Sequence, residues 1–269
     1  MKDLINMWNK TRLIVLVAVT AAVYAALMLP FKLVTIIPGY TELRPGVAIP
    51  TVFSILFGPA APWGAAFGNI VGDYLGGMLG WGSLFGLLGN FFLGYIPYRV
   101  AKPLVHRIKP GLWGTVQIIL ACALASIVCG VIIGWGLDLL GILPFATLGN
   151  IIIINNLLFT CILTPIFYRL LVFRSRRWNL HYTQVLGEDA GRRSRTFGIG
   201  IILLTIGAIG GWVAGNLLSL QIIEGSDLIA LLQQASGGGY LIEGASGSLT
   251  VSWGLSPAIL MIIAGAILI

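Results

Sequence analysis

The sequence predicts an all-α polytopic membrane protein. Apolar residues make up 58% of the 269 residues and charged residues only 9%, whereas a soluble domain carries about 25% charged residues. The apolar residues also gather in runs of about 20, the length that a helix needs to cross the hydrocarbon core of a bilayer. A soluble fold could not bury this much apolar surface, so the membrane class follows.

Six apolar runs are predicted to be membrane-spanning helices. They are residues 13–37, 80–98, 112–137, 147–172, 196–220 and 252–269. Between the first two, residues 47–57 and 60–75 are each short for one crossing, and the segment GPAAP (Gly58–Pro62) separates them. Because proline breaks helical hydrogen bonding, this region is either one broken helix or a hairpin of two short helices.

The distribution of the basic residues favours the hairpin. Of the 16 lysines and arginines, three precede the first helix, four lie within residues 99–109, and seven lie within residues 169–195. If residues 47–75 cross twice, all three clusters lie on one side, and the positive-inside rule places 14 of the 16 in the cytoplasm. The acidic loop 221–251 then lies outside. We therefore predict eight helices in the cell membrane, with both termini cytoplasmic.

The chain is predicted to divide into three parts. Residues 1–178 would form a six-helix solute-binding unit, residues 179–195 a basic cytoplasmic linker, and residues 196–269 a two-helix extension. The outer loop of the extension is rich in glycine and serine, a flexible composition. The last helix ends at Ile269 without a polar flank, which is compatible with a truncated chain.

Several function classes lack their sequence signals. There is no Walker-type nucleotide motif and no HExxH motif, and both histidines fall in basic loops. The three cysteines lie inside apolar runs without CxxC spacing, which argues against a metal site. The net charge of +7 marks cytoplasmic loops rather than a nucleic-acid partner. We therefore expect no catalysis, no cofactor and no bound metal.

Polar residues gather near the predicted outer ends of the helices, where they suggest a solute pocket. Polar groups inside a bilayer are costly unless they face a cavity or another helix. The candidate substrate-binding residues are Glu42, Arg44, Asp73, Tyr74, Trp81, Asn150, Asn155 and Asn156. The loop 38–46 would form the roof, and the helix N-terminus at residues 147–150 would add partial positive charge.

The charged candidates also have structural interpretations. Glu42 and Arg44 are two residues apart and could simply pair with each other at the interface. Asp73 could pair with Lys32 or with Arg44, and we slightly favour such a pairing over direct contact with solute.

The aromatic and amide candidates have alternatives of their own. Tyr74 and Trp81 could belong to the aromatic belt of the membrane interface. Asn155 and Asn156 point about 100° apart on a helix. We therefore expect one of the two to join helices and the other to face the pocket.

The first helix carries small residues at four-residue spacing. Ala18, Ala22 and Ala26 lie on one face, where small side chains let another helix approach closely. That helix could belong to a partner protein or to this chain.

These features together resemble the substrate-binding S component of an energy-coupling factor (ECF) vitamin transporter. The resemblance covers roughly residues 10–175. It rests on the six-helix layout, the outer loop after the first helix, the proline-broken hairpin, the alanine series and the segment FSILFGPAAPWGAAFGNIVGD. The two helices after residue 195 are not part of this six-helix pattern.

The resemblance implies a vitamin or related micronutrient as solute, and a membrane T component with two cytoplasmic ATPases as partners. Ala18, Ala22 and Ala26 would form the face that docks the T component, and the loop Ile37–Gly46 would cap the pocket. ATP hydrolysis in the partners would drive toppling of the S component. The missing nucleotide motif agrees with this division of labour.

Two other functions remain open at this point. A self-sufficient secondary transporter would use Asp73 and Glu42 as coupling groups, and a membrane-embedded enzyme or assembly factor is a third possibility. For the solute, a flat polar heteroaromatic molecule and a corrinoid-like ligand would both fit the mixture of charges, rings and amides.

Overall fold

The structure is a computed structural model. It describes residues 2–37, 41–101, 111–187, 194–220 and 249–269. Parts of four predicted features fall outside these residues: positions 38–40 of the pocket roof, positions 102–109 of the second basic cluster, positions 188–193 of the linker, and positions 221–248 of the glycine- and serine-rich loop.

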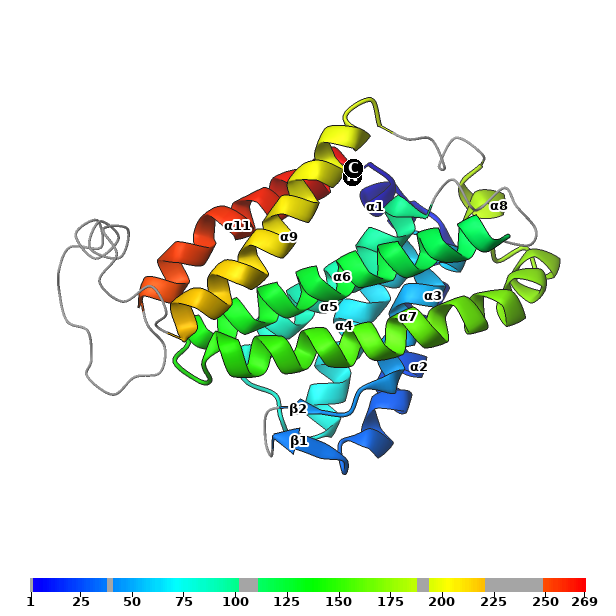
Figure 1. Ribbon diagram of the computed structural model, residues 1–269. Helices are drawn as coiled ribbons and strands as arrows, with labels where there is room; N and C mark the ends of the chain where they lie inside the picture. The colour runs from blue at the N-terminus through cyan, green and yellow to red at the C-terminus, as the bar shows by residue number, and fades with distance from the viewer. Residues whose placement is uncertain (1, 38–40, 102–110, 188–193, 221–248) are drawn as a thin grey trace.

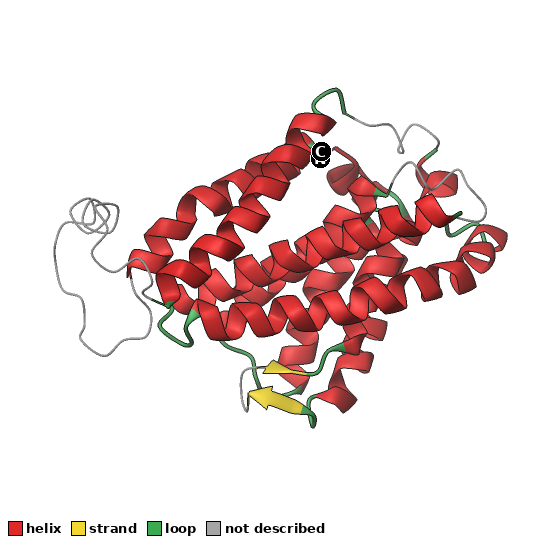
Figure 2. Cartoon of the chain, in the orientation of Figure 1, coloured by secondary structure: helices red, strands yellow, loops and turns green. Residues whose placement is uncertain are grey.

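The described residues form helices joined by loops, together with one short pair of strands (Figure 2). In chain order the elements are α1 (Lys2–Asn6), η1 (Met7–Asn9), α2 (Thr11–Phe31), β1 (Thr35–Ile37), β2 (Thr41–Glu42), η2 (Pro45–Val47), α3 (Ala48–Phe57), α4 (Ala60–Leu75), α5 (Gly82–Val100), α6 (Leu112–Leu139), α7 (Phe145–Arg177), α8 (Tyr182–Leu186), α9 (Phe197–Ser219) and α11 (Leu249–Leu268). Four helical stretches are long and apolar enough to cross a membrane: Thr11–Phe31, Leu112–Leu139, Phe145–Leu186 and Phe197–Ser219. The predicted class, an all-α polytopic membrane protein, is confirmed.

The interrupted region forms two helices, as the charge distribution predicts. The chain breaks at Gly58, which has φ +62°, and α4 begins two residues later. A side chain at Gly58 would be strained by this backbone and would lie 2.6 Å from the ring of Tyr182. Arg44, just before α3, donates a hydrogen bond to Asn69 near the end of α4 (2.9 Å), so the second helix returns to the level where the first begins.

The first long helix is shorter than predicted. The apolar run 13–37 suggests helix to its end, but α2 stops at Phe31, and Thr35–Ile37 pairs antiparallel with Thr41–Glu42. The segment 34–37 is a run of β-branched residues, which favour strands. Hydropathy does not distinguish such a strand from helix, and this is why the prediction was wrong here.

The long helices pack in a clear order across the molecule (Figure 1). Helix α2 packs on α4, α4 on α5, and α5 on α6, while α7 lies along α6 and covers α3. Every residue of α3 is buried, so this short helix is enclosed by its neighbours. The pair α9 and α11 packs on α6, at the far side of the molecule from α2.

Polar contacts tie α1, α5 and α11 together at one end of the bundle. Arg99, at the end of α5, lies 3.6 Å from the carboxylate of Asp3 and donates to the carbonyl oxygen of Ile269 (2.8 Å). Tyr95, one helical turn earlier, donates to the carbonyl oxygen of Ala266 (2.9 Å). The strand pair and the start of α7 lie toward the opposite end (Figure 1).

Candidate functional site

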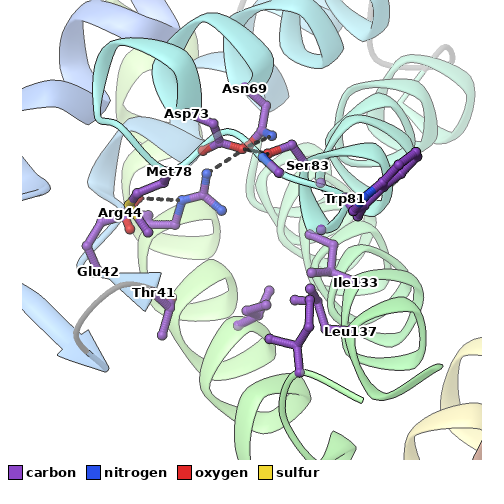
Figure 3. A pocket seen from close by; sticks show the side chains of 15 residues that line it. Thr41, Glu42, Arg44, Asn69, Asp73, Met78, Trp81, Ser83, Ile133 and Leu137 are labelled. Carbon is purple, nitrogen blue, oxygen red and sulfur yellow. Dashed lines mark hydrogen bonds and ion pairs between the residues drawn. The ribbon is translucent and has the colours of Figure 1, made fainter. Parts of the chain in front are cut away.

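A cavity of about 190 Å³ lies next to the strand pair (Figure 3). One side is polar and consists of Glu42, Arg44, Asn69, Asp73 and Ser83. The opposite side is apolar and consists of Ile133, Leu137, Ile142 and Ile152 from α6, α7 and the turn between them. A polar side that faces an apolar side is typical of sites for small organic molecules.

Arg44 provides the positive charge of the cavity. Its side chain is 11% exposed, and its Nε lies 3.4 Å from the carboxylate of Glu42, which is 6% exposed. Burial alone would lower the pKa of Arg44, but interactions with Tyr24, Glu42 and Asp73 more than offset that effect and raise it. The guanidinium therefore stays charged, and it points toward the centre of the cavity (Figure 3).

Asp73 provides the negative charge and is held by three side chains. Its carboxylate accepts hydrogen bonds from Asn69 (3.1 Å) and Ser83 (2.9 Å). Lys32, just after α2, lies 3.5 Å from the other carboxylate oxygen. The pairing with Lys32 that we considered from sequence is therefore present, and the carboxylate also lines the cavity.

Asn69 joins the two charged groups to the bundle core. Its carbonyl oxygen accepts from Arg44 (2.9 Å) and from the buried amide of Asn90 (3.0 Å), while its amide donates to Asp73. Asn90 in turn accepts from the hydroxyl of Tyr24 (2.7 Å). This continuous network fixes the positions of Arg44 and Asp73 before any ligand arrives.

Asn155 fixes the segment of Glu42 and Arg44, two residues that line the cavity. Its amide donates to the carbonyl oxygen of Glu42 (2.9 Å), and its side-chain oxygen accepts from the backbone N–H of Arg44 (3.3 Å). Asn155 itself does not line the cavity. It therefore attaches the segment to α7, the joining role expected for one of the two adjacent asparagines.

Asn156 is 1% exposed. Among the residues that the structure describes, its Oδ1 has no hydrogen-bond partner. Asn156 is also absent from the cavity lining.

Asn150, on α7, contacts helix α9 of the extension. Its side-chain oxygen accepts from the indole N–H of Trp212 (2.6 Å) and from the amide of Asn216 (3.2 Å). Four residues earlier, the backbone N–H of Ala146 donates to the hydroxyl of Ser219 (3.1 Å). Helix α9 is thereby attached to the start of α7, close in sequence to the apolar wall of the cavity.

The two aromatic candidates have different positions. Trp81 is 77% exposed and lies at the rim of the cavity, whereas Tyr74 is 68% exposed and does not line it.

The sequence interpretation missed Asn69 and Asn90. Asn69 precedes Asp73 by four residues, and this spacing places both side chains on one helix face.

A family model described as QueT transporter matches residues 14–172, more than half of the chain. The match runs from α2 to α7, so α9 and α11 lie outside it. Comparison with the curated proteins and with the solved structures gave no match. The chain therefore belongs to the QueT transporter family, and within transporters to the S components of the ECF type.

Proposed function

We propose that this chain is the solute-capturing subunit of an ATP-driven ECF-type importer and that its solute is a queuosine precursor, the solute associated with the family. Such precursors are planar bicyclic bases with ring N–H, amino and carbonyl groups. The observation that carries the proposal is the cavity in which Arg44, Asn69 and Asp73 are already fixed opposite an apolar wall.

The cavity suits a base in its chemistry. The carboxylate of Asp73 can accept from ring N–H and amino groups, and the guanidinium of Arg44 can donate to a carbonyl oxygen. Ile133 and Leu137 offer an apolar surface to one face of the ring, and Trp81 can stack at the rim. The volume of about 190 Å³ is below the roughly 300–1,000 Å³ of drug-sized sites, which favours a base over a corrinoid-like ligand.

The partner proposal rests on the exposed face of α2. Ala18, Ala22 and Ala26 are all exposed, so the alternative that they pack against another helix of this chain does not fit. A helix of a membrane T component can approach such a face closely. Cytoplasmic ATPases bound to that T component would then supply the energy.

We propose that the protein lies in the plasma membrane and that both of its termini are cytoplasmic. Arg99 of the second basic cluster lies against Asp3 near the N-terminus, and Arg169 of the third donates to Thr115 at the start of α6 (2.9 Å). These contacts support a common side for the three clusters, as the positive-inside rule requires.

The test is ligand binding to the purified protein in mild detergent. We expect native mass spectrometry to detect a bound queuosine precursor, and calorimetry to show weaker binding for Asp73→Asn but not for Tyr74→Phe, which changes an exposed neighbour outside the cavity. No binding by the folded wild type, or equal affinity in Asp73→Asn, would overturn the solute assignment. Uptake driven by a proton gradient without ATPases would overturn the ATP-driven mechanism.

A further inference from the structure

A second and larger groove lies on the outside of the bundle, away from the solute cavity. It has a volume of about 450 Å³ and runs between the first half of α2, the end of α3 and the end of α7. Its apolar part includes Val15, Val19, Phe53, Leu56 and Phe57. The family match and the solute cavity assign no role to this groove.

The groove is cationic at one end and apolar further along α2. Arg12, at the start of α2, and Arg174, in the last turns of α7, lie at the same end, together with Trp178. Val19 lies seven residues beyond Arg12, which is about 10 Å deeper along α2. Trp178 is 64% exposed, as expected for a ring at the membrane interface.

The two arginines have no acidic partner in the part of the chain that the structure describes. None of the lining residues carries a carboxylate, and the described ion pairs involve neither Arg12 nor Arg174. Two cations beside an apolar groove therefore select an occupant that has an anionic group at one end and a hydrocarbon chain at the other.

We propose that this groove binds an anionic phospholipid from the surrounding bilayer. The phosphate contacts Arg12 and Arg174, and one acyl chain lies over the exposed side chains of Val15 and Val19 on α2. A flexible chain can fill an irregular surface of large apolar side chains, whereas close approach of a partner helix favours small residues. The proposal uses no residue of the solute cavity, so it stands or falls independently of the solute.

The headgroup contacts are tested by native mass spectrometry of the full chain from nanodiscs of phosphatidylglycerol or phosphatidylcholine with identical acyl chains. We expect the wild type to retain phosphatidylglycerol about 30-fold more strongly, about 2 kcal/mol or about 1 kcal/mol for each arginine. The double variant Arg12→Gln, Arg174→Gln should lose this preference. The control Arg169→Gln, Arg177→Gln removes the same charge at exposed α7 positions outside the groove and should keep it.

The acyl-chain contacts need a second pair of variants. Val19→Trp fills the groove and should lower retention of both lipids, whereas Ile14→Trp, at an equally exposed position of α2 outside the groove, should not. Equal lipid preference in the wild type and the arginine double variant would overturn the proposal. A second outcome would also overturn it: the arginine double variant keeps its lipid but no longer copurifies with a T component. A protein segment, and not a lipid, would then be the occupant of the groove.

Discussion

Replacing Asn69 with alanine should weaken both the fold and solute binding, because this side chain joins the two halves of the polar network. Its oxygen accepts from Arg44 at 2.9 Å and from Asn90 at 3.0 Å, and its amide donates to Asp73 at 3.1 Å. Asn69 itself is 1% exposed, so three hydrogen bonds are removed at once from a buried position.

The three lost bonds differ in cost. Arg44 and Asp73 line the cavity, where water can replace the missing partner. Asn90 is 1% exposed, so one of its N–H groups would be left unsatisfied, which costs about 1–3 kcal/mol. We therefore expect a loss of about 2 kcal/mol in the free energy of unfolding, or roughly 4–8 °C in Tm by the scaling for a chain of 150–250 residues.

Solute affinity should fall at least about tenfold, or about 1.4 kcal/mol, because Arg44 and Asp73 lose the group that orients them. Thermal unfolding in detergent and calorimetric titration with a queuosine precursor measure the two effects. Ser83→Ala removes one bond to Asp73 and serves as the milder comparison. A Tm and an affinity indistinguishable from wild type in Asn69→Ala would refute the network argument.

Three further changes test separate parts of the structure. Asn155→Ala removes the two hydrogen bonds that hold Glu42 and Arg44 beside the cavity, so solute should dissociate about tenfold faster in a competitor chase; an unchanged rate would contradict the proposed attachment. Ala22→Leu places a bulky side chain on the exposed face of α2 and should abolish copurification of the T component with solute affinity intact, whereas a retained complex would argue against that docking face. Trp212→Phe removes the N–H that binds Asn150, so the free energy of unfolding should fall by about 1 kcal/mol and Tm should fall with it; no change in Tm would mean that this contact does not stabilise the extension.

The helices were predictable because bilayer thickness and helical rise together fix the length of a crossing. The hairpin at Gly58 required a second signal, the side on which basic residues accumulate. The end of α2 was missed because the β-branched segment 34–37 is as apolar as the membrane helix before it, although Thr35–Ile37 pairs as a strand. Hydropathy measures where a segment lies in the bilayer and does not report its backbone conformation.

The site was harder to predict because the position of a residue along a helix does not tell which neighbouring element its side chain faces. Asn150 and Asn155 lie on one helix, yet Asn150 contacts α9 and Asn155 holds the segment beside Arg44. The sequence grouped them because both lie near the same end. Asn69 was missed although its four-residue spacing from Asp73 was visible, because it lies in a glycine-rich segment interpreted for helix packing.

The arrangement of helices also places two proposed surfaces next to each other on α2. Val19 of the groove and Ala22 of the alanine face are three residues apart, so a T component that covers Ala22 would also reach the edge of the groove. We therefore expect added T component to lower the occupancy of anionic lipid in native mass spectra, and Ala22→Leu to prevent that loss. Unchanged lipid occupancy in a complex that forms normally would show that the two surfaces are independent. Helices α9 and α11 of the extension pack on α6 at the far side of the bundle, so these two helices do not compete for this face of α2.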